Sequence, residues 1–143
     1  MKRQIYLDYA YGVADLIWQD YDALRGQAIE RGKAALRDQG KLQNTFQFVG
    51  TVAPAEVMRY RQTGAVRYLE RAKRYLLDVY DVYHALKTYQ EVENIPIRNA
   101  DFSTLGWMFE PEPYISAYNQ IKNIACFTDE EIGRVGDSTY VLS

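Results

Sequence analysis

A long amphipathic segment between Pro54 and Glu93 constrains this chain more than any other feature of its sequence. Apolar side chains recur there every seventh residue, and a second apolar row follows four positions later. The two rows form one stripe along a helix of about 3.6 residues per turn. Gln62, Thr63 and Gly64 are the weakest point, so we expect that the first turns can form a separate helix. The stripe consists of Met58, Ala65, Leu69, Ala72, Leu76, Val79, Tyr83 and Leu86.

Residues 3–38 predict a first long helix, because apolar positions recur at helical spacing along the whole segment. Three glycines weaken it, and we expect a bend near Gly32 and an end at Gly40. The expected inward positions are Ile5, Tyr9, Val13, Leu16, Leu24, Ala28 and Ala35, broadened by Ile17, Tyr21 and Leu36.

Shorter elements account for the rest of the chain. Residues 42–52 alternate apolar and polar side chains, which indicates a short strand or an apolar loop. Residues 113–126 predict a third helix, and Thr128 with Glu131 has the spacing of a capping box. Residues 138–142 are typical of a terminal strand.

These elements together predict a mainly α fold in a single domain over residues 1–143. We expect a long antiparallel helical hairpin, a third helix across it, and one or two short peripheral strands. The segment that connects the hairpin to the third helix, at about residues 95–113, is apolar although loops are usually polar. Such a segment wraps the bundle or inserts into a partner.

Composition narrows the class of protein. The net charge of −2 gives no global argument for nucleic acid or membrane binding, and no apolar run approaches the roughly 20 residues of a membrane span. A single cysteine, Cys126, excludes a disulfide within the chain and fits a reducing compartment. Thirteen tyrosines against five phenylalanines suit interfaces, or the half-buried positions of a narrow core. We therefore expect a cytoplasmic protein, or one assembled there into a larger particle.

The residues that could carry out catalysis are few. His84 is the only histidine, and Asp81 precedes it by three residues, a spacing used twice over in di-metal bundles but present once here. We expect a structural histidine inside the bundle. No phosphate loop, dinucleotide motif or zinc spacing occurs. The expectation is a protein that is not an enzyme, with no catalytic residue, cofactor or metal.

Charge is unevenly distributed along the two long helices. Residues 54–74 are basic and residues 75–93 acidic, whereas residues 1–22 are acidic and residues 23–41 basic. An antiparallel hairpin would place basic beside basic and acidic beside acidic, which makes a rod with a positive and a negative end. Chance segregation on solvated faces is the alternative.

The leading hypothesis is a non-enzymatic assembly protein that binds copies of itself or larger partners. Its general build is that of small helical connectors and adaptors in virus particles, an analogy of architecture alone. The alternatives are a subunit of a nucleoprotein complex, with Arg59, Arg61, Arg67, Arg71 and Arg74 on phosphates, and a helical-bundle enzyme. The predicted partner-binding residues are Phe102, Leu105, Trp107, Met108, Phe109, Arg67, Arg71 and Arg74.

Overall fold

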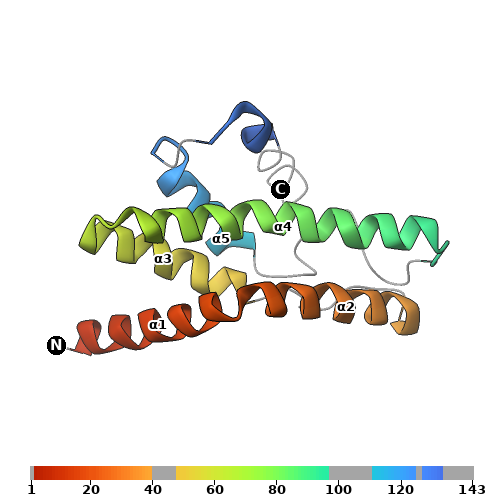
Figure 1. The fold of residues 1–143 in the computed structure, drawn as a ribbon, viewed down its shortest axis with the longest axis horizontal. Helices are drawn as coiled ribbons and strands as arrows, with labels where there is room; N and C mark the ends of the chain where they lie inside the picture. Colours follow the sequence, from red (N-terminus) through yellow and green to blue (C-terminus); the bar gives the residue numbers. More distant parts are fainter. Residues whose placement is uncertain (1, 40–47, 97–110, 125–126, 134–143) are drawn as a thin grey trace.

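A computed structural model of the chain describes residues 2–39, 48–96, 111–124 and 127–133 (Figure 1). Helices dominate these residues, which confirms the mainly α prediction. A short helical turn at residues 129–133 follows the last of the longer helices. The longer helices are α1 (Lys2–Gln19), α2 (Tyr21–Gln39), α3 (Val49–Thr63), α4 (Val66–Val92) and α5 (Pro111–Ile121).

The described residues contain no strand. The strand predicted for residues 42–52 is wrong from residue 49 onward, because α3 begins there and buries Val52 and Ala53 on one helical face. A short alternating run does not distinguish a strand from a buried helix start. Phe48 of that strand also has helical φ and ψ at the start of α3, and residues 42–47 and the strand predicted at 138–142 lie outside the described residues.

α1 and α2 form one long rod that is interrupted only at Asp20 (Figure 1). The Leu24 amide donates to the Asp20 carbonyl at 2.9 Å, so the helical hydrogen bonding resumes directly after the interruption. The helix does not break near Gly32, since α2 continues through this residue, which is buried.

The central segment is split at its predicted weak point into α3 and α4. Gly64 ends α3 with a φ of 69°, a left-handed conformation that costs a glycine little, and its amide donates to the Tyr60 carbonyl at 2.7 Å. The chain then reverses, so α3 and α4 form the antiparallel hairpin (Figure 1).

The first rod runs antiparallel to α3 but parallel to α4. Tyr11 bonds Gln62 and Asp15 bonds Arg59, a descending order, whereas the links from the rod to α4 ascend along both helices. Those ascending links are Asp15–Arg71, Tyr21–Asp78 and Arg37–Tyr89. α1 therefore packs on α3, and α2 packs on α4. The sequence predicted a first helix antiparallel to the whole central segment. This prediction is correct only for α3.

The core follows the predicted stripe of α4. Leu69, Ala72, Leu76, Val79 and Leu86 are all buried. Facing residues of the other helices complete the cluster, with Val52 and Val57 from α3, Ala117 and Ile121 from α5, and Tyr21, Ala28 and Leu36 from α2. Among the described helices none is long and apolar enough to cross a membrane.

The predicted capping box is present in the last described segment. The Thr128 amide donates to Glu131 Oε1 at 2.8 Å, and the Glu131 amide donates to Thr128 Oγ1 at 3.2 Å. This reciprocal pair satisfies two amides at the start of the short turn. Lys73 Nζ on α4 lies 3.3 Å from Glu131 Oε1, which ties the turn to α4.

Candidate functional site

α1 has two apolar faces, and the fold uses only one of them. Tyr11 and Ala14 are buried, with Trp18 half-buried one turn further on. Their positions step by three and four residues, so they share one face of the helix. This face lies against α3. The stripe that the sequence suggested as inward, which contains Ile5, Tyr9 and Leu16, is on the opposite side, and its inward placement in α1 is wrong.

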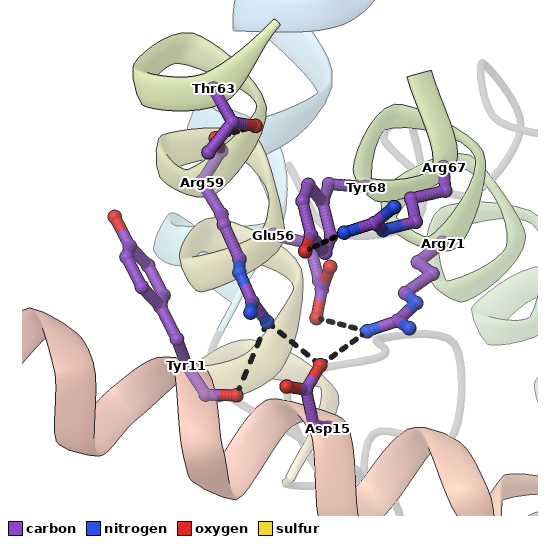
Figure 2. Close-up of polar contacts among 8 residues, drawn as sticks. All are labelled: Tyr11, Asp15, Glu56, Arg59, Thr63, Arg67, Tyr68 and Arg71. Atoms are coloured by element: carbon purple, nitrogen blue, oxygen red, sulfur yellow. Dashed lines mark hydrogen bonds and ion pairs between the residues drawn. The ribbon is translucent and has the colours of Figure 1, made fainter. Parts of the chain in front are cut away.

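Charge explains which face of α1 is buried. Asp15 lies beside the buried face and accepts hydrogen bonds from Arg59 Nη1 of α3 at 2.7 Å and from Arg71 Nη1 of α4 at 2.6 Å (Figure 2). Turning α1 to bury its other face would remove Asp15 from both arginines. Two charge-assisted hydrogen bonds on one carboxylate therefore select between two faces of similar apolar character.

The pKa of Asp15 reflects this arrangement. Partial burial raises it, but the hydrogen bonds from Arg71 and Arg59 outweigh burial and hold the pKa below its ordinary value of 3.8. Asp15 is therefore ionised when it holds both guanidinium groups. It links α1 to both helices of the α3–α4 hairpin.

Glu56 is a fully buried carboxyl group next to this pair. Its nearest cation in the described part of the chain is Arg71, whose Nη1 lies 3.6 Å from Glu56 Oε1 (Figure 2). Among the described residues neither carboxyl oxygen has a hydrogen-bond partner. Burial raises the pKa of Glu56 to about 7, against the attraction of Arg71 and Arg59. Because the residue is 0% exposed, it has no direct route to a substrate. We interpret it as a structural acid whose charge depends on pH.

The predicted partner-binding arginines lie in different settings. Arg71 is part of the partly buried network with Asp15 and Glu56. Arg74 pairs with Asp22 of α2 and with Asp78 one turn along α4. Arg67 is exposed, donates to the Tyr68 hydroxyl at 2.7 Å and lies 4.7 Å from the centre of that ring (Figure 2).

The charge-polarised rod predicted from the sequence is therefore wrong. Because the first rod runs parallel to α4, the acidic half of the rod lies beside the basic half of α4. The ion pairs Asp15–Arg71 and Asp22–Arg74 then join acidic residues of the rod to basic residues of α4 within the fold. The default antiparallel pairing of neighbours failed because α3 separates the two elements in sequence. The apolar segment with Phe102, Leu105, Trp107, Met108 and Phe109 lies outside the described residues.

The outward face of α1 is the most exposed apolar stripe in the described part of the fold. Ile5, Tyr9 and Leu16 are 66%, 74% and 64% exposed, and Tyr6 beside them is 73% exposed. Gly12 lies on the same stripe between Tyr9 and Leu16, and a side chain added there would meet no atom within 4 Å. Sequence periodicity did detect this stripe, but it could not show on which side the protein lies.

A cleft on α4 and the single histidine do not form a binding surface comparable to the stripe of α1. A cleft of about 230 Å³ is lined by Glu70, Lys73, Arg74, Leu77, Asp78 and Glu131, and several of its charges are paired within the fold. His84 is exposed and stacks on Tyr80 with 5.9 Å between ring centres, so its predicted place inside the bundle is wrong. Within the described residues no three histidine, cysteine or acidic side chains are grouped to hold a metal ion.

Comparisons with protein-family models, with curated proteins and with solved structures found no match to this chain.

Proposed function

We propose that this is a non-enzymatic assembly protein that binds another protein chain through the outward face of α1. One observation carries the proposal: three large apolar side chains, Ile5, Tyr9 and Leu16, are each about two-thirds exposed or more along one helical stripe. Single exposed apolar residues are ordinary, but an aligned apolar stripe on a helix is typical of a binding surface.

The rest of the fold supports this proposal. The partly buried network around Asp15 holds α1 so that the stripe faces away from α3. The carboxyl group with the most perturbed pKa, Glu56, is sealed inside the bundle. The arginines suggested for phosphate contacts include Arg59, Arg71 and Arg74, which are already paired with carboxylates. Binding of protein by an apolar face fits these contacts better than catalysis or nucleic-acid binding.

The test is site-specific photocrosslinking in cells that make the protein at its natural level. A benzophenone side chain in place of Tyr9 should give a discrete protein adduct on illumination. The same side chain in place of Gln27, which is exposed on α2, should not. Leu16→Glu should abolish the adduct at position 9, because a carboxylate in the stripe must be desolvated on binding. Absence of an adduct at position 9, or equal adducts at both positions, would reject the proposal.

A further inference from the structure

We infer that the partner of the outward α1 face is a second copy of this chain, with the two α1 helices paired antiparallel about a twofold axis. This inference rests on the proposed function, since it names the occupant of the same face. Three properties of the stripe support it: its spacing, the sizes of its side chains, and the charges at its two ends.

The spacing is self-complementary. Ile5, Tyr9, Gly12 and Leu16 are separated by four, three and four residues, the pattern of the contact seam in a helix pair. The order four, three, four is the same when the helix runs in the opposite direction. Ile5 of one copy then lies opposite Leu16 of the other, and Tyr9 lies opposite Gly12. A twofold contact requires this property, because each residue pair must occur twice.

Side-chain size agrees with this register. Tyr9 is 74% exposed, and Gly12 one turn further along the stripe has open space above it. In the antiparallel pair the ring of Tyr9 fits over Gly12 of the partner copy, so a large side chain meets a position without one. The fold itself gives no reason for glycine at position 12, since an added side chain would meet nothing and glycine weakens a helix interior.

Charge favours the antiparallel direction. Lys2 lies at the start of α1 and Asp20 just after its end, and helical spacing places both on the same flank of the stripe. Antiparallel pairing brings Lys2 of one copy beside Asp20 of the other, whereas parallel pairing places these two residues at opposite ends of the helix pair. On the other flank, Asp15 is already neutralised by Arg59 and Arg71.

Disulfide crosslinking tests the register directly. In a Cys126→Ser background, the double variant Ile5→Cys with Leu16→Cys should form a covalent dimer under mild oxidation. Each single variant should stay monomeric on a non-reducing gel, because its two cysteines would be about 16 Å apart along the helix axis, too far for a disulfide. Crosslinking of either single variant indicates a parallel pair or a different contact, and overturns the inference. Failure of the double variant to crosslink also overturns it.

A glycine pair provides the second measurement, by sedimentation of the purified protein across a range of concentrations. Gly12→Leu should weaken dimerisation by about tenfold or more, because its side chain occupies the place of the partner's Tyr9. Gly26→Leu is the matched control: this helical glycine is also open, but it lies on α2 beyond the seam. Both variants should fold, which circular dichroism checks.

Equal effects of the two glycine variants, or a wild-type chain that stays monomeric at all concentrations, would overturn the inference. If the chain is monomeric but still gives an adduct with another protein at position 9, the dimer inference is wrong and the proposed function stands. If the chain neither dimerises nor gives an adduct at position 9, the dimer inference and the proposed function are both wrong.

Discussion

α4 and α1 differ in how their apolar residues are arranged, and the difference decides how far each could be understood from sequence. α4 has one apolar stripe, and the buried residues Leu69, Leu76 and Val79 all lie on it. α1 has two, of which only the one with Tyr11 and Ala14 is buried. Where a helix is apolar on one side, periodicity determines its orientation. Where it is apolar on two sides, ion pairs such as Asp15–Arg71 determine it.

The largest effect should come from the stripe of α4. Leu76→Ala removes a 0% exposed side chain from the core and should lower the free energy of unfolding by about 2–5 kcal/mol through cavity formation. Leu16→Ala is the matched change on the outward stripe of α1 and should alter it by less than about 0.5 kcal/mol in dilute solution. Urea denaturation monitored by circular dichroism measures both. Similar losses at the two sites would mean that α1 buries its other face.

The second effect concerns the charge that orients α1. Asp15→Asn removes the carboxylate shared by Arg59 and Arg71, and should cost about 1–2 kcal/mol of unfolding free energy at pH 7, because solvent partly screens this side chain. Asp8→Asn is the control, since Asp8 is exposed and receives a hydrogen bond from Gln4 of its own helix. Because the pKa of Asp15 is lowered in the fold, its contribution is present above its unfolded value and should be lost as pH falls through the folded value. If the free energy of unfolding falls equally little in both variants, Asp15 does not select the buried face of α1.

An effect of opposite sign belongs to Glu56. Its pKa rises from 4.5 to about 7 on folding, so the folded chain binds more protons than the unfolded chain between these values. Stability should therefore fall as pH rises from about 4.5 to about 7. Glu56→Gln should remove this slope and stabilise the protein by roughly 3 kcal/mol at pH 8, with little gain at pH 4.5.

Thermal melts across this pH range would test the assignment to Glu56. Glu70→Gln, an exposed site on α4, should keep the wild-type slope. A Glu56→Gln variant that retains this slope would show that Glu56 does not titrate as proposed.

These contrasts also show what could be predicted from the sequence and what could not. The helical class, the break at Gly64 and the capping box at Thr128 follow from local rules, and the structure confirms them. The parallel course of α1 and α4 could not be derived, because it depends on α3 forming a separate helix between them. The buried face of α1 depends on ion pairs between residues more than 40 positions apart in sequence, such as Arg59 with Asp15. Helical periodicity contains no information about such pairs.

The unequal anchoring of the two helices has a consequence for how the fold opens. α1 contributes two buried side chains, Tyr11 and Ala14, whereas the buried residues of α4 extend from Tyr68 to Leu86. Detaching α1 therefore exposes little apolar surface, and much of its cost is the separation of one carboxylate from two arginines. Such a segment forms its own unit of local unfolding, with a lower opening free energy than the hairpin beneath it. Backbone amides of α1 then exchange with solvent from a state in which α3 and α4 remain paired.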